Sequence, residues 1–324
     1  MKTFNFTNVS EGFNGAASNS TSSLQLLLAF AVYKTILSPV TAIGNGLLVV
    51  TVLIDPLRSF RSTSSMFLLT MSAANFLTGT VVAPIFAFLE YNTFLGRKAS
   101  LQIANVGSSF SLLSFNVSFG MVFALAFDNF IAVLRPTKYK AWMTKQRAKT
   151  CIAVISLTAL TSAILPHVNV PINTVLQIDL HFNSTVNSTL LVASYILLYT
   201  AFRNHTKRSK DLRQENKQAL GKLLELQNKF RRVIFIFVLL STVPAILSTI
   251  SFHIEAYCVP CQKYQTIVIV QRVCLHLIFL KCALDPFAFG WRLSRNRQAL
   301  KKIVCCQLRT VRQIRNSDRV NFWA

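Results

Sequence analysis

Two oppositely charged residues, Lys281 and Asp285, lie four positions apart in the otherwise apolar stretch "LHLIFLKCALDPFAF". That spacing places both side chains on one face of a helix. Because an unpaired charge in apolar surroundings is costly, the two are predicted to form an ion pair. A second acid, Asp128, lies in "ALAFDNFIAVL" and is followed by Asn129 and Phe130. The chemistry that these residues offer is charge pairing within apolar segments.

Patterns of catalytic or metal-binding residues are scarce in this sequence. There is no G-x-S-x-G, no H-E-x-x-H and no Gly-rich phosphate loop. The single C-x-x-C, formed by Cys258 and Cys261, lacks the second half-site that a zinc ion needs. A disulfide in an external loop is favoured for this pair over two free thiols. We therefore expect no enzymatic activity, no cofactor and no metal site.

The elements that carry these residues are long apolar segments. Of the 324 residues, 52% are hydrophobic and 14% are charged, whereas soluble domains have about a quarter charged residues. Continuous apolar runs favour transmembrane helices over the alternating strands of a membrane barrel. The predicted fold is an all-α membrane protein, a seven-transmembrane helix bundle. Its predicted spans, each long enough to cross a bilayer, are 26–54, 64–90, 102–134, 148–170, 187–205, 231–255 and 264–291.

Basic residues gather in every second connection between these spans. The net charge is +23, and most of the 34 Lys and Arg residues follow spans one, three, five and seven. The positive-inside rule places these segments in the cytoplasm and the N-terminus outside. A basic inner surface next to anionic membrane lipid accounts for the charge, so nucleic acid is not an expected partner.

Glycosylation sequons agree with this orientation. Three of them, Asn5, Asn8 and Asn19, lie in the polar N-terminus. Two more, Asn183 and Asn187, lie in the loop that is expected between the fourth and fifth spans. All five are on the face assigned as external and are predicted to carry glycans.

Four regions are predicted along the chain. They are an extracellular glycosylated N-terminus (1–25), the seven-transmembrane domain (26–291), a short amphipathic helix (292–306) and a cytoplasmic tail (307–324). Cys305 and Cys306 follow the basic stretch "WRLSRNRQALKK" at the end of the amphipathic helix. Palmitoylation of these two residues is favoured over unmodified thiols.

Local motifs follow one another in an order known from a large family. The first span contains Asn45 in "GNGLLVV", the second contains "LLTMSAANFLTG", and the third ends after Asp128. The sixth contains Pro244 in "STVPAI", and the seventh contains "ALDPFAFGW" with Pro286. Together with the seven spans, these motifs resemble the rhodopsin-like (class A) G-protein-coupled receptors over nearly the whole chain. The resemblance implies a multi-pass plasma-membrane receptor for an extracellular small molecule, with a heterotrimeric G protein as partner.

The sequence departs from this family at the D-R-Y triplet, which reads Asp128, Asn129 and Phe130. In the family, the acid holds the arginine at rest, and the open receptor presents the arginine to the G protein. Asn129 is shorter and neutral, so it cannot form that charge-assisted pair. Higher basal opening and impaired coupling are the two competing consequences. Impaired or atypical coupling is favoured, and the alternative is that basic neighbours such as Arg231 compensate.

Other switch positions are partly altered. Tyr199 matches the fifth-helix tyrosine, Thr242 replaces the sixth-helix tryptophan, and Phe289 replaces the tyrosine of the seventh-helix N/D-P-x-x-Y motif. The switch and coupling residues that the resemblance implies are Asp128, Asn129, Phe130, Tyr199, Thr242, Pro244, Asp285, Pro286 and Phe289.

The family's sodium pocket is altered as well. Its helix-two acid is Asn75 here, its helix-three serine is Ser118, and the acid stands at Asp285 instead. We expect the ammonium of Lys281 to occupy the place of the sodium ion. The alternative is that Lys281 extends elsewhere while water links Asp285 to Asn75 and Asn45.

The resemblance also bears on the ligand. Amine receptors of this family carry an aspartate where Ser111 stands, and opsins carry a lysine where Phe279 stands, so neither an amine nor retinal is favoured. The expected pocket residues, for each of which packing between helices is the alternative, are Ser111, Leu112, Phe115, Phe279, His253 and Glu255. This lining favours a small, largely apolar ligand.

Two other functions remain open at this point. One is a receptor that binds ligand but signals weakly, as a scavenger or as a partner in a heteromer. The other is a small-solute transporter using intramembrane charges such as Lys34. The transporter is disfavoured because the sequence shows no internal repeat of hydropathy.

Overall fold

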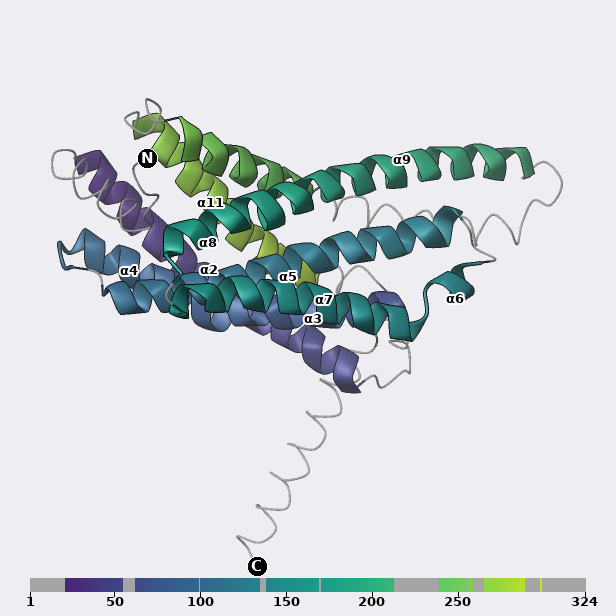
Figure 1. The fold of residues 1–324 in the computed structure, drawn as a ribbon, viewed down its shortest axis with the longest axis horizontal. Coiled ribbons are helices and arrows are strands. Elements are labelled where there is room, and N and C mark those ends of the chain that lie inside the picture. The colour runs from purple at the N-terminus through teal and green to yellow at the C-terminus, as the bar shows by residue number, and fades with distance from the viewer. Residues whose placement is uncertain are drawn as a thin grey trace, which may run out of the picture.

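Apolar helices lying side by side make up the bundle in the computed structural model (Figure 1). The structure describes residues 21–54, 62–98, 100–134, 138–168, 170–212, 239, 241–254, 256–258, 265–288 and 298. Every regular element in these ranges is helical. The described part of the chain confirms the predicted all-α fold.

The first half of the bundle consists of three long spans. The first is α2 (Thr21–Ile54), and the third is α5 (Leu101–Leu134). The second is α3 (Thr63–Leu77), which continues through a π-helical turn, η2 (Thr78–Val82), into α4 (Ala83–Phe94). Residues Leu24–Ile54, Thr63–Phe94 and Leu101–Ala132 are each long and apolar enough to cross a membrane. These helices agree with the first three predicted spans.

The second half contains the remaining helices. A short helix, α6 (Tyr139–Trp142), precedes α7 (Lys145–Ile164), which ends in the 3-10 turn η3 (Leu165–His167). The next span is built from α8 (Ile172–Ile178), a π-helical segment η4 (Asp179–Thr185) and α9 (Val186–Leu212). An apolar helix, Ser241–Ile254, and α11 (Gln265–Pro286) follow. Lys145–His167 is also long and apolar enough to cross a membrane.

The predicted boundary of the fifth span is wrong. The sequence places a loop before residue 187, but the structure has continuous helix from Ile172. Pro171 stands at the N-cap of this helix, where its missing N–H breaks no hydrogen bond. Asn183 and Asn187 therefore lie on a helix, and the loop location on which their predicted glycosylation rests is wrong.

Side-chain caps explain where two other helices begin. The hydroxyl of Ser62 accepts a hydrogen bond from the backbone N–H of Ser65 at 3.3 Å, at the start of α3. The hydroxyl of Thr144 accepts one from the N–H of Arg147 at 3.3 Å, at the start of α7. Each cap satisfies a donor that the first helical turn leaves unpaired.

A close crossing joins the first two spans at the π-helical turn. The hydroxyl of Ser38 donates to the carbonyl of Gly79 at 2.8 Å. A Cβ atom at Gly79 would lie only 2.5 Å from the backbone nitrogen of Ala42, so no larger residue fits there. This contact holds the first span against the second one beside the polar core of the bundle.

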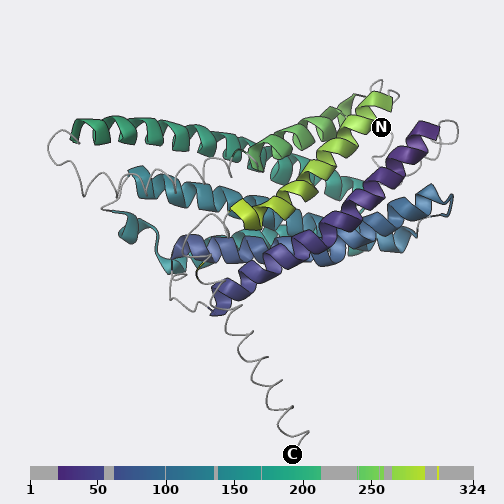
Figure 2. The ribbon, with the colours of Figure 1, turned by 180° about the vertical axis from the view of Figure 1, so that it is seen from behind.

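The third span, α5, lies at the centre of the bundle. It packs against α3, α4, α7 and α9, and Figure 2 shows it between neighbouring helices from the opposite side. Its buried residues Val117, Met121 and Val122 belong to the main hydrophobic core. The helices that line the cavity described below are grouped around α5.

Candidate functional site

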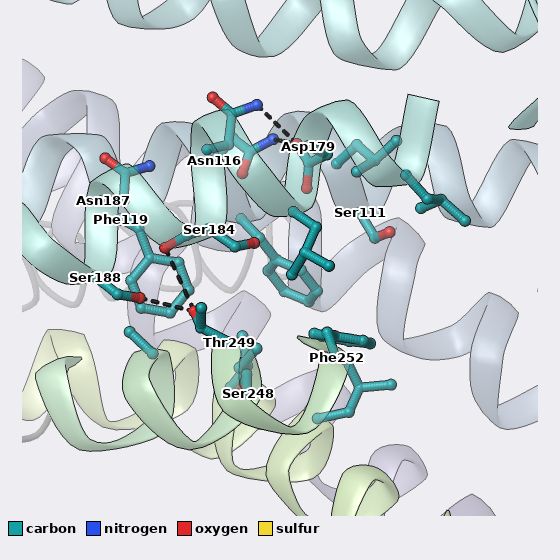
Figure 3. Close-up of a pocket in the computed structure, with 18 of the residues that line it drawn as sticks. Ser111, Asn116, Phe119, Asp179, Ser184, Asn187, Ser188, Ser248, Thr249 and Phe252 are labelled. Atoms are coloured by element: carbon teal, nitrogen blue, oxygen red, sulfur yellow. Dashed lines mark hydrogen bonds between the residues drawn. The ribbon is translucent and has the colours of Figure 1, made fainter. Parts of the chain in front are cut away.

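A cavity of about 130 Å³ lies between α5, the helix built from α8, η4 and α9, and helix Ser241–Ile254 (Figure 3). Apolar rings and branched side chains form most of its wall. Its aromatic residues are Phe115, Phe119 and Phe252. Its polar residues are Ser108, Ser111, Asn116, Gln177, Asp179, Asn183, Ser184, Asn187, Ser188, Ser248 and Thr249.

Three of the six predicted pocket residues, Ser111, Leu112 and Phe115, line this cavity. Phe279 is not part of the lining. It is 2% exposed and packs edge-on against Phe115, with ring centroids 5.4 Å apart. The lining also lacks His253, which instead hydrogen-bonds the hydroxyl of Thr185 at 2.9 Å. Glu255 lies outside the described residues.

A half-buried carboxylate on the cavity wall, Asp179, escaped sequence reasoning. Oδ1 of Asp179 accepts hydrogen bonds from the side-chain amides of Asn116 at 2.6 Å and Asn183 at 2.7 Å. Asn183 also donates to the hydroxyl of Ser162 at 3.1 Å, on α7. These contacts fix Asp179 between the third, fourth and fifth spans. Only the knowledge that residues 172–185 are helical could have revealed the cluster.

A second polar contact of the cavity joins the fifth and sixth helices. The hydroxyls of Ser188 and Thr249 are hydrogen-bonded at 2.8 Å (Figure 3). Thr249 also donates to the carbonyl of Ser184 at 3.4 Å. A molecule in the cavity would therefore contact the two helices at the point where side chains link them.

The predicted pair of Lys281 and Asp285 is present in the core of the bundle. Nζ of Lys281 lies 2.9 Å from Oδ2 of Asp285 and donates to the hydroxyl of Ser118 at 2.6 Å. The amide of Asn75 donates to the same carboxylate oxygen at 2.6 Å. Nζ also lies 4.8 Å from the ring centroid of Phe119, which lines the cavity. The ion pair of Lys281 and Asp285 thus links helices two, three and seven.

Asn45 holds the neighbouring part of this core. Its amide donates to the carbonyl of Thr41 at 2.9 Å and to that of Cys282 at 3.0 Å, which ties α2 to α11. The structure gives Asn45 no direct bond to Asp285. The amide oxygens of Asn45 and Asn75 are both buried without a hydrogen-bond partner among the described residues.

Asp128 is held by hydroxyl groups from two other helices. Oδ1 accepts from Thr63 at 3.0 Å and from Tyr139 at 2.9 Å, and Oδ2 accepts from Ser64. Burial raises the pKa of the Tyr139 phenol, so its hydroxyl stays protonated and able to donate. Asn129 does not contact Asp128 and donates instead to the carbonyl of Leu125 at 2.6 Å.

Comparison with known proteins identifies the architecture. The family model described as "7 transmembrane receptor (rhodopsin family)" matches residues 44–289. The chain belongs to this receptor family. It is therefore a multi-pass receptor of the plasma membrane, built as a seven-helix bundle. The predicted family and location are confirmed.

Individual relatives of the receptor match only part of the chain. The muscarinic acetylcholine receptor DM1 of Drosophila melanogaster is 28% identical over 131 residues, which are 40% of this chain and 16% of that protein. Cannabinoid receptor 1 of Xenopus laevis is 30% identical over 139 residues (43% and 29%). Cannabinoid receptor 1 of Taricha granulosa is 30% identical over 146 residues (45% and 30%). The aligned regions thus span less than a third of each relative.

The other residues for which a switch role is predicted lie on the following helices, and their roles stay predictions. Phe130 follows Asn129 on α5, and Tyr199 lies on α9. Thr242 and Pro244 lie on helix Ser241–Ile254. Pro286 ends α11, and a Cβ atom added to Gly44 would lie 2.9 Å from its ring. Phe289 lies outside the described residues.

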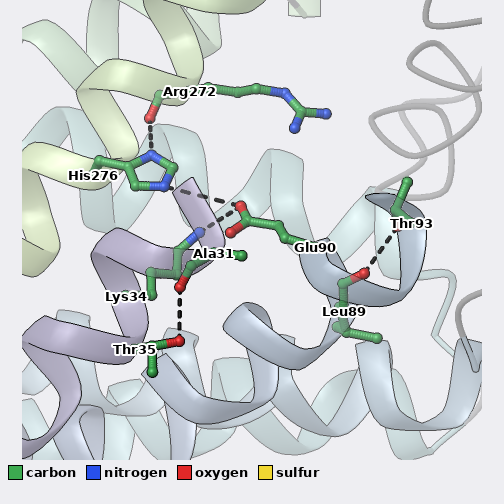
Figure 4. A network of polar contacts seen from close by, with 8 residues as sticks. All are labelled: Ala31, Lys34, Thr35, Leu89, Glu90, Thr93, Arg272 and His276. Carbon is green, nitrogen blue, oxygen red and sulfur yellow. Dashed lines mark hydrogen bonds and ion pairs between the residues drawn. The ribbon is translucent and has the colours of Figure 1, made fainter. Parts of the chain in front are cut away.

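A second charged network of the receptor joins α2, α4 and α11 (Figure 4). Nζ of Lys34 lies 2.5 Å from Oε1 of Glu90, and Nε2 of His276 lies 3.9 Å from the same oxygen. Lys34 is 1% exposed, and its ammonium also lies 5.5 Å from the ring centroid of Phe279. The sequence shows the lysine but not its partner.

Several predicted modification sites lie outside the described residues. They are the sequons at Asn5, Asn8 and Asn19, the cysteine Cys261 that is expected to pair with Cys258, and the palmitoylation sites Cys305 and Cys306. These modifications, and the amphipathic helix 292–306, stay predictions.

Proposed function

We propose that this receptor binds an extracellular small molecule in the described cavity and couples atypically, or weakly, to its G protein. The geometry around Asn129 is the observation that supports atypical or weak coupling. Its amide is satisfied within its own helix by Leu125, at 2.6 Å. Asp128 is satisfied by hydroxyls, so neither side chain offers the cation that a D-R-Y arginine would present.

The cavity is placed to transmit a signal along the helices. It touches the helix built from η4 and α9 and the sixth helix, which the Ser188–Thr249 bond joins at 2.8 Å. A ligand there changes the spacing of these two helices or competes for their hydroxyls. Pro244, five residues before Thr249, gives the sixth helix a missing backbone N–H and therefore a point at which to bend.

The polar core gives the receptor an internal cation. In our proposal, the ammonium of Lys281 replaces the sodium ion of related receptors and is bonded to Asp285 and Ser118. A covalently attached cation cannot leave the bundle when the helices rearrange. The core then responds to movement of α11 and not to the sodium concentration.

The names of the relatives do not indicate one class of ligand for this receptor. One is a muscarinic acetylcholine receptor and two are cannabinoid receptors, which indicate unlike molecules. The mostly apolar wall of the cavity supports a small ligand with a large apolar part.

Ligand-free recruitment of G protein in cells tests the coupling proposal. The native chain should recruit weakly, and Asn129→Arg should increase recruitment at equal surface expression, because it restores a cation beside Asp128. Asn129→Gln is the matched control, since it lengthens the side chain without adding charge. Strong recruitment by the native chain, or an equal gain in both variants, would overturn the proposal. A receptor that binds ligand and stays silent until Asn129→Arg is introduced is a scavenger or a heteromer partner.

A further inference from the structure

We infer that the ligand of this receptor carries a protonated amine or amidinium group that pairs with Asp179 on the fifth helix. The inference rests on the proposed function, because it assigns the chemical class of the molecule that fills the cavity. The two carboxylate oxygens of Asp179 have unequal surroundings. Oδ1 accepts both amide hydrogen bonds, from Asn116 at 2.6 Å and from Asn183 at 2.7 Å. Oδ2 receives no hydrogen bond from the described residues, and Asp179 lines the cavity.

The carboxylate also lacks a cation. No Lys, Arg or His among the described residues comes within ion-pair distance of Asp179, although Lys34 and Lys281 each have an acid partner. Asp179 is half-buried, and withdrawing a carboxylate from water is costly in proportion to its burial unless a positive charge compensates it. The two amides orient Asp179 and favour its charged form but bring no charge of their own. A cationic ligand is the missing component of this arrangement.

The rest of the wall limits the body of the ligand. Phe115, Phe119 and Phe252 line the same cavity as Asp179. Aromatic faces attract ammonium groups as well as apolar surface. The volume of about 130 Å³ is close to that of an engineered cavity of about 150 Å³ that binds benzene. A monoamine with one compact aromatic or aliphatic group therefore fits the observed space.

The backbone presents Asp179 in an unusual way. The π-helical segment η4 begins at this residue, and the hydroxyl of Thr185 donates to the carbonyl of Leu180, five residues earlier, at 2.7 Å. Such π turns are rare and frequently lie at functional sites. The acid that amine receptors carry on the third helix is Ser111 here, whose hydroxyl bonds the carbonyl of Ser108 in its own helix at 2.7 Å. The charge that recognises an amine is thus on helix five.

The test compares matched small molecules on the purified full-length receptor without G protein. The probes are phenethylamine and tryptamine, each paired with the alcohol of the same skeleton, 2-phenylethanol and tryptophol. Thermal unfolding at neutral pH is recorded against concentration. The amines should raise Tm and the alcohols should not. Asp179→Asn, which keeps the shape and removes the charge, should weaken the amine effect by more than about tenfold.

Asp211→Asn is the control, because Asp211 lies in the last turn of α9 and is not part of the cavity lining, and this variant should keep the amine effect. If Asp179→Asn does not fold, the amines and the alcohols are compared on the native chain and on Asp179→Glu, which keeps the negative charge. In both proteins, the amines should raise Tm and the alcohols should not. Equal effects of amine and alcohol, no effect of either amine, or an amine effect that survives Asp179→Asn would overturn the inference. Amine binding together with strong ligand-free recruitment of G protein by the native chain would count against the coupling proposal alone. Weak recruitment by the native chain without any amine effect would count against this inference alone.

Discussion

The side-chain amide of Asn129 donates to the backbone carbonyl of Leu125 at 2.6 Å, one turn earlier on the same helix. This bond leaves the adjacent Asp128 to partners from other segments, the hydroxyls of Ser64, Thr63 and Tyr139. At this site, hydroxyl groups join the third span to α3 and α6. These bonds occupy Asp128 in place of an acid–arginine pair.

Tyr139→Phe should loosen this junction. The change removes a hydroxyl that donates to Oδ1 of Asp128 at 2.9 Å, and a hydrogen bond to a charged group contributes about 1.5–3 kcal/mol. We expect a loss near the lower end of that range, because Thr63 and Ser64 still donate to the carboxylate. Thermal unfolding of the purified receptor measures it. Tyr91→Phe, at a position 48% exposed, is the control, and equal effects of the two changes would contradict the assigned role.

Lys281→Met should make the receptor sensitive to sodium. The change removes the ammonium and leaves the carboxylate of Asp285 and the hydroxyl of Ser118, both of which bonded it. Hard cations prefer such oxygen ligands. Sodium at ten times its Kd would then add about 1.4 kcal/mol to the stability of the variant. The measurement is Tm in sodium chloride compared with choline chloride at equal ionic strength.

The native chain should show no such difference between the two salts. The double variant Lys281→Met with Asp285→Asn should lose the effect again, because no charged ligand remains for the ion. If the native chain responds clearly to sodium and Asp285→Asn alone abolishes that response, the lysine does not occupy the ion's place.

Lys34→Met should destabilise the receptor strongly. It leaves Glu90, which lies 2.5 Å from the ammonium of Lys34, without its lysine partner. Breaking a buried pair from one side costs about 3–5 kcal/mol. The double variant Lys34→Met with Glu90→Gln removes both charges and should recover most of the loss. A double-mutant cycle on thermal unfolding tests this coupling, and simple additivity of the two losses would contradict it.

The sequence predicts contacts that are set by local spacing better than contacts between distant segments. Lys281 and Asp285 are four residues apart, so the helical repeat alone brings them together. The pairing of Lys34 with Glu90 spans 56 residues and depends on the packing of the first two spans. Hydropathy reveals that such spans exist but not which of their residues face one another.

The fifth helix shows where hydropathy fails as a guide. Asp179, Asn183 and other polar residues before 187 lower the apolar content, so this part of the sequence resembles a loop. These side chains satisfy one another within the bundle, which lets a polar segment stay helical. Pro171, which precedes the first helical residue, is a sequence signal that could have extended the helix.

Glycan mapping should separate the N-terminal sequons from those of the fifth helix. The amide nitrogen of Asn183 already donates to Asp179 at 2.7 Å and to Ser162 at 3.1 Å. Asn187 lies a turn further along and lines the cavity. A glycan needs an asparagine accessible on an external segment, so changing either residue to Gln should leave the glycosidase-sensitive mass unchanged. Changing Asn5, Asn8 and Asn19 together should abolish it, which would place the N-terminus outside the cell. A glycan lost on Asn183→Gln would mean that residues 172–185 do not enter the bundle in the folded receptor, and the pocket with Asp179 would not exist.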